Sequence, residues 1–473
     1  MKIQKQITLY VLLGLIAFLG INFCWRGWAN SPQWKQFNAL APLELRTESE
    51  WADFRRQLAI AQRMGIHAIV TDIWWGKVEA GGDQQFNWEY YDRLMQAIQA
   101  ANLHWIPIFS FHQCGGNVGD DCDIPIPSWI WTHFPQVPAT DLKYISEKGN
   151  ASPEVIALWA DQWVIPEYQE FITAFTQHYA DQAEIIDEIQ ISLGSAGELR
   201  YPAYNAHDDY QYPHRGYFQA YSTPAKIAFQ DYVRDRYGNL KAINQAWKTN
   251  LTSLNQIQPP KQPEQFVQRR DYEKIQYGRD FIDWYNQSLI NHGQRILNAA
   301  NNTLQGKFQT IPLGMKIPGI HWQIAHPKTP RIAEITTGLI RTSINFQSPK
   351  TGYGYLPLLQ VANSLPSSQE VNLHYTAVEL SNRRDQKLQA HSRAKDLVGW
   401  IATTANRLGI PLHAENALQG ELRNPQAWKN INEAFNRYQF SGFTALRLAE
   451  ATENRFGRRQ YQQLMERRIE ISK

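Results

Sequence analysis

The sequence predicts an α/β protein, a (β/α)8 TIM barrel with long loops. Eight apolar runs rich in β-branched residues alternate with stretches of helical periodicity, which is the pattern of a parallel sheet. Each run carries a polar residue near its C-terminal end, the edge at which barrel enzymes place their functional groups. A length of 473 residues suits either two domains or one large barrel, and the regular alternation favours the barrel.

The expected strands follow one another along the whole body of the chain. They lie at 37–45, 67–75, 104–112, 184–193, 314–322, 371–380, 410–418 and 442–448. A helix is expected at 49–64, directly after the first strand. Residues 205–310 form a long insertion between the fourth and fifth strands. An insertion of this length in a barrel usually builds a wall of the active-site cleft.

A tight loop follows the fourth strand. Small residues at 194–197 end the strand, and a single carboxylate, Glu198, comes next, with Arg200 two positions later. Such a carboxylate at the C-terminal end of a barrel strand is in the position of a catalytic group. On these residues alone, a surface glutamate paired with an arginine is an equally good interpretation.

The loop after the third strand is rich in glycine. Residues 112–120 contain three glycines, with His112 at the beginning and Asp120 at the end. This composition is typical of a mobile lid over a substrate, although a structural glycine turn has the same composition.

Both loops resemble the signatures of glycoside hydrolase family fourteen, the β-amylases. Residues 194–204 read Gly-x-x-Gly-Glu-Leu-Arg-Tyr-Pro-x-Tyr, and residues 112–120 match the family's other signature. The resemblance implies an inverting exo-hydrolase that releases β-maltose from the non-reducing ends of α-1,4-glucans. It implies that Glu198 is the general acid and that Glu415, in Glu-Asn-Ala-Leu, is the general base. An inverting pair stands about 6.5–9.5 Å apart so that a water molecule fits beside the sugar.

The resemblance extends to positions that would contact the glucan. A single aspartate or lysine at a strand end is often only a structural ion pair, but together these positions span 72–447. Pro318 stands where the family more often has serine. Thr376 matches a threonine that positions the attacking water. The implied substrate-binding residues are Asp72, His112, Asp120, Lys316, His321, Thr376, Asn416, Ala417 and Arg447.

Two acidic segments suggest a structural calcium ion, because calcium prefers carboxylate and carbonyl oxygens. Bacterial members of the family carry calcium at matching places. The five side chains include no basic residue, so they would repel one another without a cation; a solvated helix face is the alternative. The expected ligands are Glu79, Asp83, Gln84, Glu167 and Glu170. No organic cofactor is implied.

The first 29 residues are expected to direct export. They combine basic residues with an apolar run at 7–23 and no acid, which is typical of a signal peptide cleaved after Ala29 or of an uncleaved anchor. The net charge of +3 belongs to this leader, since the remaining body is neutral and shows no nucleic-acid footprint. Residues 30–473 would then form a secreted or periplasmic catalytic domain. In an oxidising compartment Cys114 and Cys122 are expected to form a disulfide.

The expected partner is starch, glycogen or maltodextrin, and the protein is expected to be a monomer. Any membrane contact would come only from the leader. The 26 residues after Arg447 are too few for an appended starch-binding domain. Two alternatives remain: a retaining barrel glycosidase, whose carboxyls would stand about 5–5.5 Å apart, and a catalytically silent glucan-binding protein.

Overall fold

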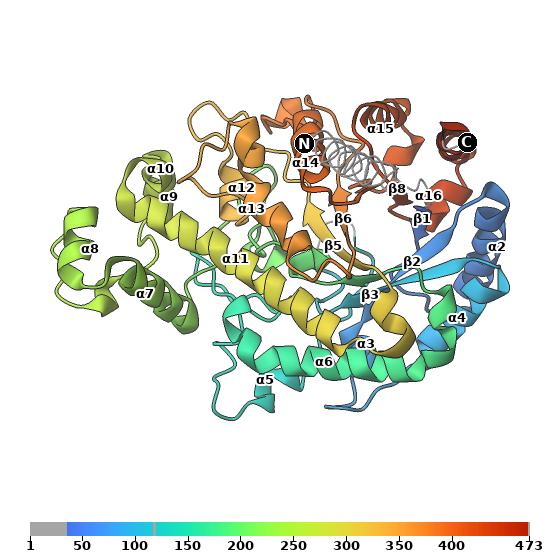
Figure 1. Ribbon diagram of the computed structural model, residues 1–473, viewed down its shortest axis with the longest axis horizontal. Coiled ribbons are helices and arrows are strands. Elements are labelled where there is room, and N and C mark those ends of the chain that lie inside the picture. The colour runs from blue at the N-terminus through green and yellow to red at the C-terminus, as the bar shows by residue number, and fades with distance from the viewer. Residues whose placement is uncertain (1–35, 117–119, 472–473) are drawn as a thin grey trace, which may run out of the picture.

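The computed structural model describes residues 36–116 and 120–471 (Figure 1). Eight parallel strands close into a barrel in sequence order, and the last strand pairs with the first. The strands are β1 (Gln36–Leu40), β2 (Ala68–Trp74), β3 (His104–Ser110), β4 (Ile189–Ile191), β5 (Leu313–Pro318), β6 (Val371–Thr376), β7 (Leu412–Glu415) and β8 (Gly442–Ala445). The predicted (β/α)8 barrel is therefore confirmed.

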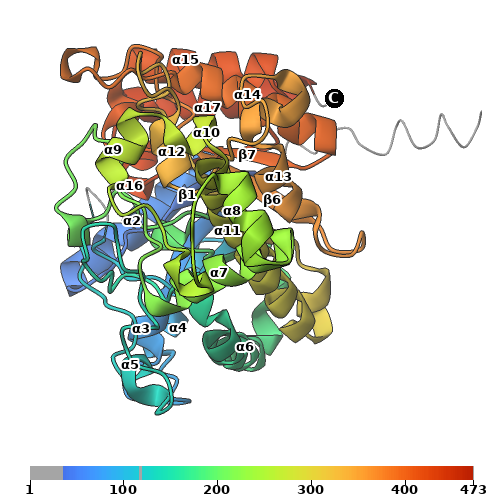
Figure 2. The same cartoon turned by 90° about the vertical axis from the view of Figure 1, so that its left-hand side faces the viewer.

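Helices surround the barrel, and α7 to α10 gather on one side of it (Figures 1 and 2). The helices are α2 (Glu48–Met64), α3 (Trp75–Val78), α4 (Glu89–Ala100), α5 (Ile130–His133), α6 (Asp161–His178), α7 (Thr223–Tyr237), α8 (Leu240–Trp247), α9 (Pro263–Gln268), α10 (Asp271–Lys274), α11 (Gln276–Thr303), α12 (Ile332–Thr336), α13 (Leu356–Leu359), α14 (Ala394–Leu408), α15 (Pro425–Arg437), α16 (Leu448–Thr452) and α17 (Arg455–Ile471). Within the described ranges, none of them is both long and apolar enough to cross a membrane.

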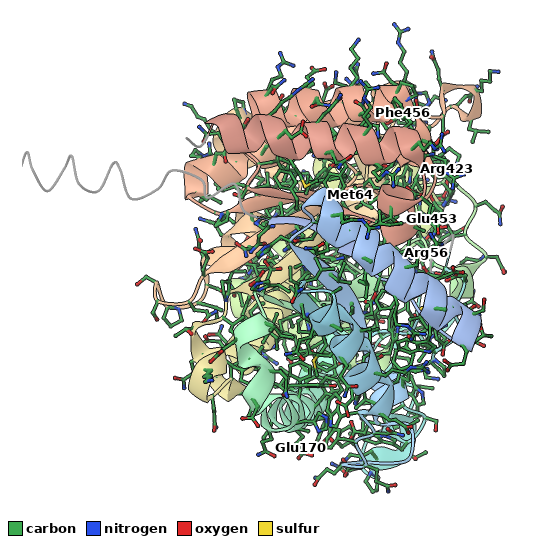
Figure 3. All side chains as sticks on the ribbon, turned by 90° about the vertical axis from the view of Figure 1, so that its right-hand side faces the viewer. Arg56, Met64, Glu170, Arg423, Glu453 and Phe456 are labelled. Atoms are coloured by element: carbon green, nitrogen blue, oxygen red, sulfur yellow. A yellow bond between two sulfur atoms is a disulfide. The ribbon has the colours of Figure 1, made fainter. Side chains whose placement is uncertain are left out.

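Helix α2 shows how the sequence sets the ends of an element. Thr47 and Glu50 form a reciprocal capping box at its start, and Gly65 ends it in the left-handed conformation. Near the other end of the chain, Glu453 directly follows α16. Its Oε1 atom forms an ion pair with Arg56 Nη2 of α2, at 2.7 Å (Figure 3). This contact joins α2 to the end of α16, a helix that also contacts β1 and β8.

The barrel interior is apolar on one side and polar on the other. Leu40, Val70 and Ile106 belong to a buried cluster on β1 to β3. On the opposite side Glu188 lies 2.6 Å from His374 on β6. Burial acts to raise the pKa of Glu188, but the charge and hydrogen bond of His374 prevail and lower it to about 2.

The expected strands are longer than the observed ones, mainly at their C-terminal ends. The run 37–45 stops pairing at Leu40, 371–380 stops at Thr376, and 410–418 is a strand only over Leu412–Glu415. The strand expected at 184–193 is three residues long. The overshoot has a physical reason, because the chain must leave the ladder for its side chains to turn into the cleft.

The insertion at 205–310 does more than build a wall. It contains α7 to α10, and it also contains the 28-residue α11, which packs against α6 as part of the helical layer (Figure 1). The expectation of a cleft wall is wrong for α11. The leader at 1–29 lies outside the described residues.

Candidate active site

Glu198 reaches the mouth of the barrel through a short turn after β4. Gly194 has a φ of 156°, and a Cβ atom there would lie 2.7 Å from the carbonyl oxygen of Arg200, so only glycine fits. The turn returns the chain to the barrel, where Leu199 donates its backbone N–H to Lys316 O at 2.9 Å. Glu198 consequently stands beside β5 at the C-terminal edge of the sheet.

Two side chains hold the Glu198 carboxylate. Arg200 Nε donates to Glu198 Oε2 at 2.9 Å, and Thr376 Oγ1 donates to Oε1 at 2.7 Å. Arg200 is fully buried, donates to Asn205 Oδ1 at 2.8 Å and stacks over the ring of Tyr204. The interpretation of a surface glutamate–arginine pair is wrong, because both side chains are buried inside the cleft.

Glu415 ends β7 on the neighbouring side of the same mouth. Lys316 Nζ donates to Glu415 Oε2 at 3.0 Å, and both side chains are buried. Thr376, which holds Glu198, is the residue of β6 that pairs with Glu415 of β7. Glu198 and Glu415 therefore lie at the same C-terminal mouth of the barrel, with Thr376 and Lys316 beside them.

Glu154, a buried carboxyl that sequence analysis did not single out, supports the turn that presents Glu198. Glu154 accepts hydrogen bonds from Ser195 Oγ and from Asn205 Nδ2, both at 2.6 Å. Asn205 also donates to the carbonyl oxygen of Gly116, at the beginning of the glycine-rich loop. Glu154 thereby joins the loop that presents Glu198 to the loop expected to act as a lid.

Asp72, His112 and Lys316 lie close together at the cleft. Burial lowers the pKa of His112 to about 3, and the charges of Lys316 and Arg200 add to this effect, so the ring is neutral. His112 Nδ1 lies 2.9 Å from Ser192 Oγ. Burial raises the pKa of Asp72, while Lys316, a hydrogen bond from Ser110 and Arg447 act in the opposite direction.

Asn416 and Ala417 shape the loop after Glu415. Asn416 Oδ1 accepts the N–H of Leu446, which fastens the end of β7 to the end of β8. The N–H of Ala417 is held by both oxygens of Glu379, at 2.9 and 3.1 Å. Burial raises the pKa of Glu379 to about 8. The resemblance to the β-amylase signatures gave no role to Glu379, although this residue stands only three positions after Thr376.

The remaining expected contacts surround the cleft. His321 lies 3.0 Å from Ser392 Oγ, and burial lowers its pKa to about 4. Arg447 is half-buried just beyond β8 and donates to Leu446 O. Asp120 accepts the N–H of Gly115 at 3.1 Å. Residues 117–119 of the same loop lie outside the described residues.

Cys114 and Cys122 form a disulfide, with their Cα atoms 5.7 Å apart. The bond spans the glycine-rich loop, and an antiparallel bridge between Cys114 and Ile124 lies next to it. Both cysteines are buried against Trp74. The disulfide therefore closes the base of this loop, which packs against Trp74 at the end of β2.

The expected calcium ligands also converge. Glu79 and Glu167 are buried, and burial raises the pKa of each to about 7, with further contributions from neighbouring carboxylates that include Asp83 and Glu170. A solvated helix face does not describe these two groups. One oxygen each of Asp83 and Glu170 is buried and has no hydrogen-bond partner among the described residues. This donor set fits a calcium ion.

A histidine also stands beside these five side chains. His133 of α5 places Nε2 3.5 Å from Glu167 Oε1 and Nδ1 3.9 Å from Asp83 Oδ2. His133 could not be inferred from the sequence, because α5 belongs to a loop more than thirty residues away from either acidic segment. Gln84 takes part through its backbone, whose N–H donates to Glu79 Oε1.

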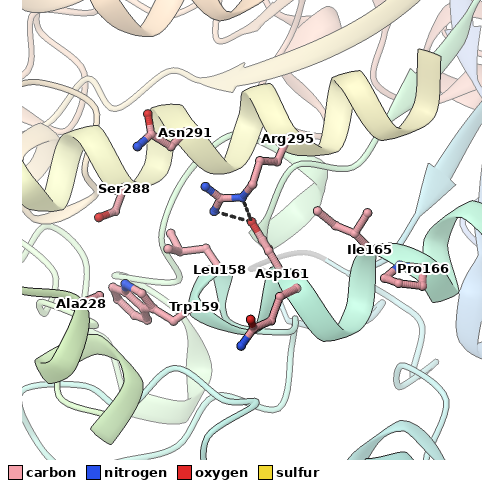
Figure 4. A pocket seen from close by; sticks show the side chains of 10 residues that line it. Leu158, Trp159, Asp161, Ile165, Pro166, Ala228, Ser288, Asn291 and Arg295 are labelled. Atoms are coloured by element: carbon pink, nitrogen blue, oxygen red, sulfur yellow. Dashed lines mark hydrogen bonds and ion pairs between the residues drawn. The ribbon is translucent and has the colours of Figure 1, made fainter. Parts of the chain in front are cut away.

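A groove of about 570 Å³ lies between α6, α7 and α11, away from the two carboxylates (Figure 4). Asp161 and Arg295 form an ion pair along it. Asp161 also binds His292, whose Nε2 lies 3.2 Å from Leu193 O. Through His292, these contacts hold the segment that directly follows β4 from outside the barrel.

A closed parallel barrel with two buried carboxyls at its C-terminal mouth is the arrangement found in barrel glycoside hydrolases. The chain belongs to glycosyl hydrolase family 14, whose model matches residues 40–472. It is 36% identical over 452 residues to a β-amylase of Cytobacillus firmus, covering 95% of this chain and 89% of that protein. It is 38% identical over 426 residues to a β-amylase of Bacillus cereus, covering 90% and 73%. The crystal structure of the catalytic domain of β-amylase from Paenibacillus polymyxa matches with a TM-score of 0.78 at 33% identity, covering 90% of this chain and 97% of that one.

Proposed function

We propose that this chain is a β-amylase that hydrolyses α-1,4-glucans from their non-reducing ends with inversion and releases β-maltose. The observation that carries the proposal is the pair Glu198 and Glu415 at one mouth, flanked by Thr376 and Lys316. Family membership supports the same activity. A silent glucan-binding protein would have no need to keep both carboxyls in this setting.

Each carboxyl has a distinct role in this reaction. Glu198 donates a proton to the glycosidic oxygen as the bond to the anomeric carbon breaks. Glu415 accepts a proton from a water molecule, which attacks the opposite face of the sugar. The Lys316 ammonium lies beside Glu415 and suits a base that works in its charged form. Thr376, which contacts Glu198 and pairs with Glu415 in the sheet, would orient that water.

The surrounding polar groups would bind the glucan. The neutral His112 ring can donate or accept a hydrogen bond, which suits a sugar hydroxyl better than a charged imidazolium would. Asp72, Asp120, His321 and Arg447 are the further groups proposed to contact sugar hydroxyls. Asn416 and Ala417 would complete the wall beside the base. Starch, glycogen and maltodextrin all present the same α-1,4-linked end.

Calcium would be held by Glu79, Asp83, Glu167 and Glu170, with Gln84 completing the turn. The ion would be structural, since its ligands lie on α6 and in the segment after α3, which are not the elements that carry Glu198 and Glu415. His133 would have to be neutral to share this position with a cation. Export is supported by the disulfide, which is typical of oxidising compartments. We further propose that the protein is a monomer.

Glu198→Gln and Glu415→Gln test the activity. Each exchange removes the charge and proton chemistry while it keeps the shape of the side chain, so kcat on maltopentaose should fall by at least about a thousandfold. Maltopentaose binding, measured by calorimetry, should change little. Glu184→Gln, on the surface, is the matched control and should retain full activity. Near-normal turnover by either active-site variant would contradict the assignment.

A further inference from the structure

The opposite end of the barrel carries a second group of metal-ligating side chains. We propose that His67, His104 and Asp187 form a site for a divalent transition metal ion of the Zn²⁺ type. The three residues lie at the N-terminal ends of three consecutive strands: His67 directly precedes β2, His104 begins β3, and Asp187 stands two residues before β4. Their ligand atoms lie within 4.8 Å of one another.

One carboxylate is shared by two imidazoles. His67 Nε2 lies 2.5 Å from Asp187 Oδ2, and His104 Nδ1 lies 2.8 Å from Asp187 Oδ1. Only the His104 contact has the alignment of a hydrogen bond; Asp187 Oδ2 is buried and has no hydrogen-bond partner among the described residues. A second nitrogen thus points at an oxygen that it does not satisfy. A cation bound to all three groups would replace both contacts, once the side chains move slightly apart to make room for it.

The backbone holds the three residues in place before any ion binds. The N–H of His104 donates to His67 O at 3.1 Å, and the N–H of Asp187 donates to Trp105 O at 3.2 Å. The His67 and His104 rings are stacked, with centroids 4.6 Å apart and an angle of 22°. Little ordering is therefore needed on binding, which favours affinity.

The site is accessible and does not require an ionised histidine. The side chains of His67 and His104 are 39% and 42% exposed, and that of Asp187 is 19% exposed, so an ion can enter from solvent and keep water ligands. A neutral imidazole frees one nitrogen for a metal by moving its proton to the other nitrogen. In this site the coordinating atoms would be His67 Nε2 and His104 Nδ1.

The ligand types select the metal. Two imidazole nitrogens and one carboxylate oxygen suit zinc, copper or nickel, whereas calcium prefers oxygen alone. The site therefore differs in chemistry from the carboxylate group at Glu79 and Glu167. An ion here would cross-link the ends of β2, β3 and β4 and raise the stability of the native state by mass action.

Titration calorimetry with ZnCl2 on the calcium-saturated protein tests the proposal. We expect one Zn²⁺ per chain, and His104→Gln and Asp187→Asn should each weaken its binding by about tenfold or more. His178→Gln is the matched control, because His178 pairs with Asp92 at 2.7 Å on the surface without a second histidine. Zinc should also raise the melting temperature of the wild type and of His178→Gln, but not of His104→Gln.

Two results would overturn this site. One is the absence of zinc binding to the wild-type protein at submillimolar concentrations. The other is zinc binding that survives His104→Gln and Asp187→Asn but disappears in His133→Gln, which would assign the ion to the carboxylate group near α5. Neither result bears on the proposed hydrolysis, since these residues lie at the end of the barrel away from Glu198 and Glu415.

Discussion

Removal of the proposed calcium ion should destabilise the protein in a pH-dependent way. Without a cation, the pKa values of Glu79 and Glu167 rise from an ordinary 4.5 to about 7, chiefly because both carboxyls are buried. In the unfolded chain both would titrate near 4.5. Below that pH both states are protonated and these groups cost nothing. As the pH rises to about 7 and beyond, the native state must hold buried charges, so the calcium-free protein loses stability.

The size of this loss follows from the two pKa values. A rise from 4.5 to about 7 corresponds to roughly 3 kcal/mol for one carboxyl, at about 1.36 kcal/mol per pH unit. The two groups repel each other, which counts part of this energy twice, and solvent screens another part. About 2 to 4 kcal/mol for the pair is therefore expected. In a chain of this size that free energy corresponds to a change of roughly 2 to 4 °C in the melting temperature.

Thermal unfolding with and without EGTA measures the effect. At about pH 8, EGTA should lower the melting temperature by several degrees and added calcium should restore it. At about pH 5 the two curves should nearly coincide, because the carboxyls are protonated and bind calcium weakly. Glu170→Ala should reduce the difference at pH 8, and Glu184→Gln should leave it unchanged. An EGTA effect of equal size at both pH values, or none at either, would refute the reasoning.

Three further predictions concern the loops and the leader. Mass spectrometry of the purified protein should find one Cys114–Cys122 linkage; two free thiols after aerobic purification would contradict it. Glu379→Ala leaves the N–H groups of the loop after Glu415 without acceptors and should lower kcat by about tenfold, with Glu379→Gln milder because its amide oxygen still accepts; equal activity of both variants and the wild type would exclude a positioning role. N-terminal sequencing of exported protein should begin near Asn30, whereas an intact Met1 in the membrane fraction would indicate an anchor.

The barrel was predictable because its signal is local. Apolar runs and glycine-rich loops can be read from neighbouring residues, and the two loops around Glu198 and His112 carry enough identical positions to indicate the family. The ends of strands were harder to place. The chain at 377–380 and 416–418 is as apolar as the strands that precede it, yet it leaves the sheet to line the cleft.

Residues that act through distant partners were missed. Glu154 supports the catalytic turn from forty-one positions away, through Ser195. His133 contacts the expected calcium ligands from the short helix α5, whose sequence carries no metal-binding pattern. Both depend on tertiary packing that brings separate loops together, and no spacing in the sequence records that packing. Glu379 lay inside a recognised segment, but its role follows only from its contact with the backbone of Ala417.

The anomeric form of the first product tests the central claim most directly. Proton NMR of maltopentaose during the first turnovers distinguishes the two anomers of maltose before mutarotation mixes them. If Glu198 and Glu415 act as acid and base on opposite faces of the sugar, the initial signal is that of β-maltose alone. An initial α-maltose signal, or glucose released from internal cuts, would contradict the inverting exo-hydrolysis proposed for this chain.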